Sequence, residues 1–314
     1  RSISVKSAAW MSLAILIAMN YYTPQPARSP YKSIQKALLL PDSKIVYRAS
    51  SPYGLIELVS APSLRYAPGL SLNYRDPIPS RDILFHNGDW MGAVIPAPAG
   101  DSLTILSYTA AALPYVTGQR EKVLILNPGA GENVAMAKSY GAGRIDVVEP
   151  NPTVTSLLKK ELAASTDSLL LTPEVATHHM EPRTFLNTSG GVYDLIQLPA
   201  IGSFFGTSGL DAFSIRNELT LESFQEMWHK LSPDGMISIT CWMDYPVRSP
   251  LKVLSTLSLL MDSQGIREPE RHLAAIRSWS ALSFVLKHSR FTDDEISRIR
   301  EFCDSLSFDP LLLP

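Results

Sequence analysis

The hydrophobic pattern from residue 123 onward alternates between two kinds of segment. Short continuous apolar runs predict buried strands, whereas stretches with apolar positions three or four apart predict helices. Strands are predicted at Val123–Leu126, Ile145–Val148, Glu174–His178, Tyr193–Gln197 and Met236–Cys241, with a closing antiparallel pair at Arg271–Ile276 and Ser280–Leu286. Helices are predicted at Ser102–Leu113, Asn133–Tyr140, Thr153–Ala164, Leu221–Leu231, Leu251–Gln264 and Thr292–Leu306. This alternation predicts an α/β fold with a mainly parallel sheet.

The pattern before residue 100 is different, and it divides the chain into three parts. Residues 1–42 hold an apolar segment and a proline-rich linker, Thr23–Pro30. Residues 43–100 form a small β-rich module with turn chemistry at Ser51-Pro52-Tyr53-Gly54 and His86-Asn87-Gly88-Asp89. Residues 101–314 form the larger α/β domain, with Pro114 expected to stop its first helix.

The apolar run Ala8–Met19 is shorter than the roughly 20 residues that span a bilayer. It fits the end of a transmembrane helix, the core of a signal peptide, or a buried helix of a soluble domain. We favour the membrane end, since Trp10 and the pair at 21–22 supply aromatic residues near its limits. The basic residues that follow indicate a cytoplasmic exit: Arg28, Lys32, Lys36, Lys44 and Arg48.

Composition narrows the function classes. The formal net charge of −2 offers no basic excess for binding nucleic acid. The two cysteines, Cys241 and Cys303, indicate a reducing compartment rather than a disulfide framework. The six histidines form no metal-binding pattern, so no metal is expected.

The segment from Val123 to Pro152 carries the chemistry. Two strands flank a glycine turn, Asn127-Pro128-Gly129-Ala130-Gly131, and a helix, and Glu149 ends the second strand. Small residues let the backbone approach a ligand closely, and an acid about 20 residues further on can accept both hydroxyls of a ribose. Glu132 at the start of the helix would repel a pyrophosphate, so an uncharged or cationic nucleoside fits better than a dinucleotide. A plain strand–helix turn with an incidental glutamate is the alternative.

These motifs, together with Val148-Glu149-Pro150-Asn151-Pro152, resemble the first two motifs of class I S-adenosylmethionine-dependent transferases. Within that fold, residues 43–286 resemble the spermidine-synthase-like aminopropyltransferases, in particular the bacterial branch joined to a membrane segment. The resemblance implies a Rossmann-like, seven-stranded methyltransferase-type sheet behind a small N-terminal β module. It also implies a site for decarboxylated S-adenosylmethionine or S-adenosylmethionine. The residues expected to bind this cosubstrate are Asn127, Gly129, Ala130, Gly131, Glu149 for the ribose and Glu181 for the adenine.

The same resemblance shows departures at the acceptor site. Aminopropyl transfer needs a carboxylate to hold the protonated amine and to take a proton. The family places acids after the fourth strand and in the glycine turn, where this chain has Gln197 and Ala130. Gln197 can orient a nucleophile but is no base, and Tyr108 matches a family tyrosine. Glu218, Asp101 or Asp211 could replace the missing acids, and Glu218 follows a glycine- and phenylalanine-rich segment, 201–210, expected to be a mobile flap. Arg65, Tyr66 and Tyr74 are candidates for a substrate lip.

The predicted function is transfer of an aminopropyl group from an adenosyl sulfonium donor to a small-molecule amine, with Gln197, Glu218 and Tyr108 as catalytic residues. The alternatives are a methyltransferase, a nucleoside-binding module without turnover, and a nicotinamide-linked enzyme on a similar fold. The predicted location is the cytoplasmic face of the bacterial inner membrane, and a homodimer is a further expectation.

Overall fold

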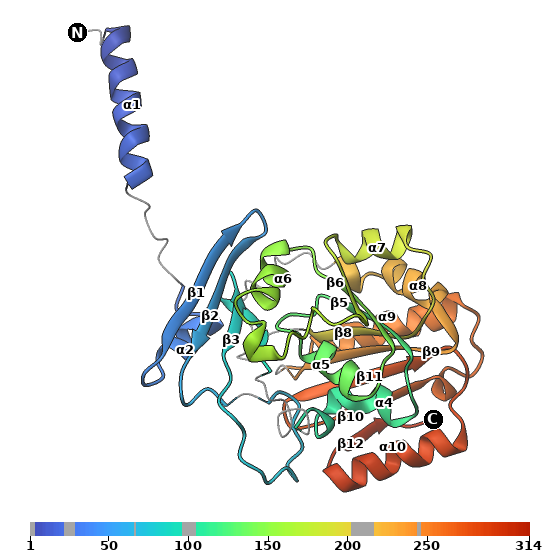
Figure 1. Cartoon of the computed structure of the whole chain (residues 1–314). Helices are drawn as coiled ribbons and strands as arrows, with labels where there is room; N and C mark the ends of the chain where they lie inside the picture. The colour runs from blue at the N-terminus through green and yellow to red at the C-terminus, as the bar shows by residue number, and fades with distance from the viewer. Residues whose placement is uncertain (1–3, 22–28, 66, 96–104, 202–216, 244–245) are drawn as a thin grey trace. The chain divides into compact units, whose positions relative to one another are not determined.

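The computed structural model describes residues 4–21, 29–65, 67–95, 105–201, 217–243 and 246–314 (Figure 1). Contacts divide the chain into two units, Arg1–Pro30 and Tyr31–Pro314. Several residues named above lie outside the described part of the chain: Tyr66, Asp101, Asp211 and the predicted flap from residue 202 onward.

The first unit contains one described helix, α1 (Val5–Tyr21), which covers the predicted apolar run. It has 17 residues. Among the described residues, no helix is both long enough and apolar enough to cross a membrane. Membrane attachment, a membrane-linked branch of the family and the cytoplasmic-face location therefore stay predictions.

The second unit begins with α2 (Ser33–Leu38) and a small antiparallel sheet. Its strands are β1 (Lys44–Ser51), β2 (Gly54–Ser60), β3 (Ile83–His86) and β4 (Asp89–Ala93), in that order. Asn87 and Gly88 both have positive φ, 51° and 79°, as the tight turn between β3 and β4 requires. Ile34 of α2 packs with Val59 and Phe85 in a core of this sheet's own.

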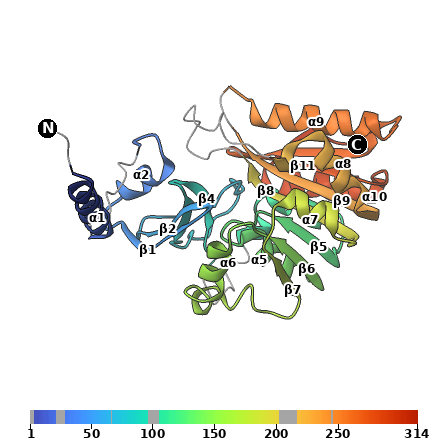
Figure 2. The ribbon, with the colours of Figure 1, turned by 90° about the horizontal axis from the view of Figure 1, so that it is seen from above.

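The large sheet has eight strands in the order β12-β10-β11-β9-β8-β5-β6-β7. They are β5 (Lys122–Leu126), β6 (Arg144–Val148), β7 (Val175–His178), β8 (Tyr193–Ile201), β9 (Leu231–Trp242), β10 (Leu273–Arg277), β11 (Ala281–Lys287) and β12 (Asp309–Leu312). Strands β9, β8, β5, β6 and β7 are parallel, and β11, β10 and β12 add antiparallel pairs. Figure 2 shows β5, β6 and β7 side by side.

The expected count of seven strands is wrong by one. The chain continues past the last helix and adds β12 at the free edge of β10. Ser307 makes this reversal with a left-handed φ of 54° at the end of that helix. A sequence pattern does not reveal this strand, because all four of its residues are exposed and lack a one-sided apolar period.

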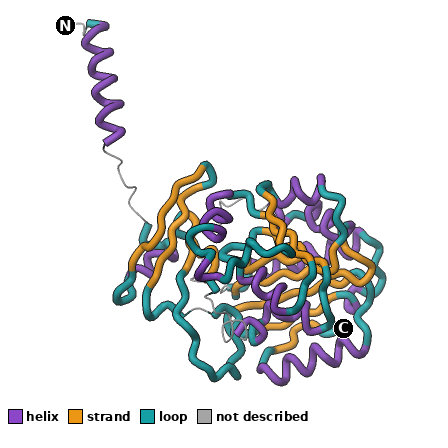
Figure 3. The backbone as a smooth tube through the Cα atoms, viewed as in Figure 1, coloured by secondary structure: helices purple, strands orange, loops and turns teal. Residues whose placement is uncertain are grey.

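Alternate residues of the parallel strands enter two separate cores, as period-two geometry requires. Val123 and Ile125 pack on one face with four helices: α4 (Leu113–Val116), α5 (Glu132–Ser139), α6 (Pro152–Lys159) and α10 (Asp293–Leu306). Leu124 and Leu126 pack on the other face with three helices: α7 (Pro182–Thr188), α8 (Leu221–His229) and α9 (Ser249–Ser263). Figures 1 and 3 show helices on both sides of the sheet, which explains why its central strands are apolar throughout.

Several predicted element boundaries differ from the structure, and the reason is clear for three of them. Strand β8 continues beyond Gln197, because β9 goes on pairing with it as far as Ile201 and Cys241. Strand β9 begins at Leu231, five residues before its predicted start at Met236. Pro114 lies in the first turn of α4, where a missing N–H costs nothing, and does not stop a helix there.

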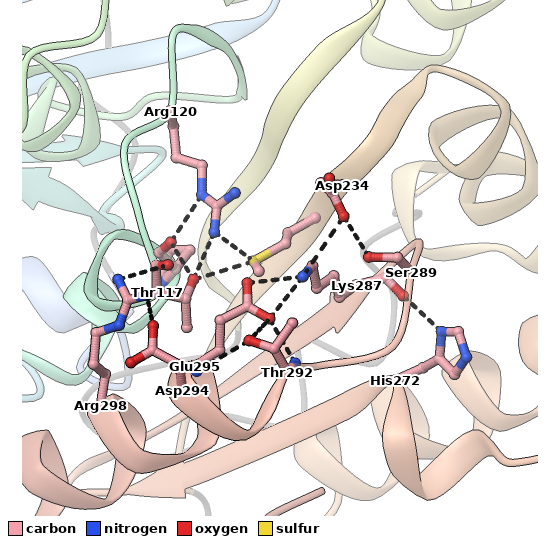
Figure 4. A network of polar contacts seen from close by, with 12 residues as sticks. Thr117, Arg120, Asp234, His272, Lys287, Ser289, Thr292, Asp294, Glu295 and Arg298 are labelled. Carbon is pink, nitrogen blue, oxygen red and sulfur yellow. Dashed lines mark hydrogen bonds and ion pairs between the residues drawn. The ribbon is translucent and has the colours of Figure 1, made fainter.

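A buried ion pair joins α10 to the large sheet (Figure 4). Lys287 of β11, with its side chain only 4% exposed, donates to both carboxylate oxygens of Glu295 at 2.7 Å. Glu295 also completes a capping box by accepting from the backbone N–H of Thr292 at 2.8 Å. The pair therefore fixes the first turn of α10 against the strand that precedes it.

Candidate functional site

The glycine turn lies between β5 and α5, at the carboxyl edge of the parallel strands. Asn127, Gly129 and Gly131 all have positive φ, at 55°, 59° and 92°. The backbone N–H of Asn127 donates to the carbonyl of Val148 at 2.9 Å, which ties the turn to the end of β6. Gly131 is the residue that precedes the first turn of α5. The sequence therefore predicted this strand, turn and helix correctly.

The backbone of β4 packs directly against this turn. A Cβ placed on Gly129 would lie 2.1 Å from the carbonyl oxygen of Met91, and one on Gly92 would lie 2.7 Å from the backbone nitrogen of Ala130. Ala130 is 1% exposed. The small residues thus admit a protein backbone at this point, a role that the sequence interpretation, which considered only a ligand, did not include.

Replacement of Gly129 with alanine is expected to reduce the free energy of unfolding by about 2–5 kcal/mol. The new methyl group would meet the Met91 carbonyl, and alanine disfavours the left-handed φ. Urea denaturation measures the loss. Gly190→Ala is the matched control, since nothing lies within 4 Å of its Cβ position, and it should change stability by less than about 1 kcal/mol. Equal stability of the two variants would contradict the packing of β4 on the turn.

Glu149 follows β6 and is 3% exposed. Its Oε1 accepts from the backbone N–H of Asn151 at 2.9 Å, whereas its Oε2 is buried and has no hydrogen-bond partner among the residues that the structure describes. Burial raises the pKa of Glu149 to about 7, against the hydrogen bond from Asn151, and the charge of Glu181 raises it slightly further. A buried carboxylate oxygen without a partner is costly and suits a ligand that brings hydroxyl donors.

Two polar residues, Asn151 and Glu181, lie near the carboxylate of Glu149. Asn151 is 4% exposed, and its Oδ1 accepts from the backbone N–H of Thr153 at 3.0 Å to cap α6. Its Nδ2 is buried and makes no hydrogen bond within the described segments. Glu181, exposed at the start of α7, is close enough to influence the charge of Glu149. The end of β6 therefore offers one unpaired acceptor and one unpaired donor, the complement of a vicinal diol.

Arg81 is a residue that sequence reasoning missed. It precedes β3 and is 2% exposed, and its Nη1 lies 3.4 Å from Oε1 of Glu132, the first residue of α5. The pair joins positions 51 residues apart, and no pattern in the sequence connects them. Glu132, interpreted from sequence as a repulsive charge, therefore has a cationic partner.

The three predicted catalytic residues lie on separate elements. Gln197 lies inside β8, 1% exposed, and its Oε1 accepts from the Tyr115 hydroxyl at 2.8 Å. Tyr108 instead packs edge-on against Tyr74, with 5.3 Å between ring centroids. Glu218 is half-buried in a short turn, Asn217–Leu219. Within the described residues, no hydrogen bond or ion pair joins these three side chains, so their catalytic roles stay predictions.

A pocket of about 420 Å³ lies beside the tyrosine pair. Tyr74 lines it together with Arg65 and Trp279, and most of its surface is apolar. No carboxylate is among the described residues that line it. Among these described lining residues Arg65 is the only charged one, whereas a polyamine would need acidic partners.

The described residues contain no group of three or more His, Cys, Asp or Glu side chains that could hold a metal ion. Around Glu149, the described residues leave one buried acceptor and one buried donor unpaired. With five parallel strands, a glycine turn after β5 and a buried acid after β6, the chain has a methyltransferase-like α/β fold.

Comparison with solved structures shows that the fold is similar to that of spermidine synthases. The spermidine synthase from Thermotoga maritima superposes with a TM-score of 0.55 at 13% identity, over 82% of this chain and 78% of that one. A spermidine synthase in complex with the transition-state analogue AdoDATO gives 0.54 at 12% identity, with the same coverage. A probable spermidine synthase from Corynebacterium glutamicum gives 0.54 at 15% identity, over 85% and 90%.

The chain therefore has a spermidine-synthase-like fold, as its sequence motifs predicted. No protein-family model matches the sequence, and no curated protein sequence matches it either. At 12–15% identity the similarity describes the fold, and the reaction must be argued from the site itself.

Proposed function

We propose that the chain binds an adenosyl sulfonium cosubstrate at the end of β6 and transfers a group from it to a small-molecule acceptor. The observation that carries this proposal is Glu149, a buried carboxylate with one oxygen unpaired beside the glycine turn. The unpaired Nδ2 of Asn151 supports it, because a ribose diol both donates and accepts hydrogen bonds. The likeness to a spermidine synthase in complex with AdoDATO supports the same class of ligand.

In this proposal the residues have separate tasks. Glu149 accepts hydrogen bonds from the ribose hydroxyls, and Glu181 accepts one from the adenine amino group. The turn from Asn127 to Gly131 supports the sugar from below. The lone pair of an acceptor attacks a carbon of the sulfonium in line, the carbon–sulfur bond breaks, and the neutral thioether leaves with the bonding electrons. The protein would therefore contribute mainly positioning and acceptance of a proton from the acceptor.

Aminopropyl transfer to an amine is the reaction that the spermidine-synthase-like fold favours. Its donor would be decarboxylated S-adenosylmethionine, and Glu218 and Tyr108 remain the candidates to receive the amine. Gln197 cannot act as the base, because an amide does not take up a proton at neutral pH, and its Oε1 already accepts from Tyr115.

Methyl transfer from S-adenosylmethionine is the second candidate, and specific features favour it. The glycine turn has Ala130 where the family has an acid, and the pocket lined by Tyr74 and Trp279 has no carboxylate among its described residues. If this pocket receives the acceptor, its mainly apolar lining suits an acceptor that is less cationic than a polyamine. Binding without turnover is the remaining alternative.

The by-product of the reaction separates these candidates. The protein is incubated with S-adenosylmethionine or its decarboxylated form, together with a panel of amines and neutral nucleophiles, and the nucleosides are analysed by mass spectrometry. Methylthioadenosine identifies transfer of the three-carbon group, and S-adenosylhomocysteine identifies methyl transfer. We expect one of these products to form at a rate above that without protein. Nucleoside binding without either product would support the non-catalytic alternative, and no binding at all would refute the proposal.

A further inference from the structure

The guanidinium of Arg81 is buried and has more N–H donors than hydrogen-bond acceptors around it. Its side chain is 1% exposed, and within the described part of the chain its one ion pair is the 3.4 Å contact between Nη1 and Glu132. Its Nε and Nη2 are buried and make no hydrogen bond to any described residue. These two nitrogens carry three of the five N–H donors of a guanidinium. Burial lowers the pKa of Arg81, which Glu132 partly offsets, so the surroundings favour an additional negative charge.

Glu132 begins α5 directly after the glycine turn. Burial raises the pKa of its carboxyl group, whereas Arg81 and the backbone at Ala93 lower it. The positive end of the helix dipole also lies at this point. A cation with unpaired donors and a half-buried carboxylate thus lie next to each other at one end of the turn.

This end of the turn is the one that the proposed cosubstrate would reach. Leu126 of β5 pairs with Val148 of β6, so the turn after β5 adjoins Glu149 after β6. If a nucleoside binds with its ribose on Glu149 and its 5′ side over the turn, that substituent would point toward the first residue of α5. In S-adenosylmethionine that substituent ends in an α-carboxylate and an α-ammonium, whereas in the decarboxylated form only the ammonium remains.

We propose that Arg81 and Glu132 form the subsite for the amino-acid end of an adenosyl donor that retains its carboxylate. Arg81 donates from Nε and Nη2 to the two carboxylate oxygens, the forked geometry that guanidinium groups favour. Glu132 accepts from the α-ammonium. The inference rests on the proposed function and selects S-adenosylmethionine over its decarboxylated form as the donor.

Calorimetry on the full chain with three nucleosides tests this inference. S-Adenosylmethionine is expected to bind about 10- to 100-fold more tightly than its decarboxylated form, because only the intact donor pairs the free donors of Arg81. Arg81→Met should abolish this preference while changing the affinity for methylthioadenosine, which has no amino-acid end, by less than about threefold. Arg81→Lys keeps the charge without the fork and should lose most of the preference.

Two control variants separate binding from folding. Arg120→Met removes another buried guanidinium, whose partners are Pro114, Thr117 and Met236, and it should leave the preference between the donors unchanged. Glu132→Gln should weaken both donors about equally, since both carry the ammonium, and should spare methylthioadenosine. Circular dichroism verifies that each variant is folded.

The outcomes are distinguishable. If methylthioadenosine binds but the two donors bind equally well, the subsite is wrong and the proposed function stands. The subsite is also wrong if Arg81→Met weakens all three ligands alike, because Arg81 would then only support the fold. If none of the three binds to folded wild-type protein, the proposed function and this inference both fail.

Discussion

Replacement of Glu149 with glutamine is expected to weaken the binding of methylthioadenosine about 100-fold. The variant keeps the shape of the side chain but loses the charge that accepts from the ribose hydroxyls, and charge-assisted hydrogen bonds contribute about 1.5–3 kcal/mol each. Calorimetry at pH 8 measures the effect.

The affinity of the wild-type protein for methylthioadenosine should rise between about pH 5.5 and pH 7 and then level off, because the pKa of Glu149 is about 7 and the carboxylate form binds. The variant should show no such dependence.

The same substitution is expected to stabilise the free protein at pH 8. The pKa of Glu149 is raised from 4.5 to about 7 in the folded state, so between these values the folded chain holds a proton that the unfolded chain releases. Stability therefore falls as pH rises through this window, and the cost above pH 7 is about 3 kcal/mol. Glutamine avoids this cost. Urea denaturation at pH 5 and pH 8 should show a gain of about 1–3 kcal/mol at the higher pH only.

Glu161→Gln is the matched control, because Glu161 is exposed close to the end of α6 and has no proposed role. It should alter neither binding nor stability by more than about 0.5 kcal/mol. Unchanged ligand binding by Glu149→Gln would remove the basis of the ribose assignment. Loss of both binding and stability would assign Glu149 a structural role instead.

Replacement of Lys287 with methionine is expected to lower the free energy of unfolding by about 3–5 kcal/mol. The change leaves the carboxylate of Glu295, which is 8% exposed, without its cation, and an unpaired buried charge is among the most destabilising defects in a protein. Figure 4 shows how Lys287 lies between Glu295 and Asp234. Urea denaturation at pH 7 measures the loss.

Two further variants define the origin of this loss. Arg290→Met removes the cation of an exposed pair with Glu268, at 2.9 Å, and should cost less than about 1 kcal/mol. Adding Glu295→Gln to Lys287→Met removes the unpaired charge and should recover about 1–3 kcal/mol, while the glutamine can still accept from Thr292. If the double variant is no more stable than Lys287→Met alone, packing rather than charge is responsible for the loss.

The sequence predicted the elements that carry the site because each depends on local chemistry. Apolar runs specified β5 and β6, the positive φ values at Gly129 and Gly131 explain the glycines, and the capping box at Thr292 began α10 at the expected residue. The boundaries that failed depend on neighbours. Strand β8 continues past Gln197 to Ile201 because β9 continues to pair with it, and β12 forms where β10 offers it a free edge.

By itself, the sequence determined the α/β class, the glycine turn and the acid that follows β6, since these follow from side-chain period and backbone conformation over short distances. Only the tertiary structure decided that Gly129 receives the backbone of Met91, that Gln197 is bound to Tyr115, and that Glu132 has Arg81 as its partner. Each of these contacts joins segments more than 35 residues apart. Their energy comes from burial and pairing across that separation, which no local pattern of residues records.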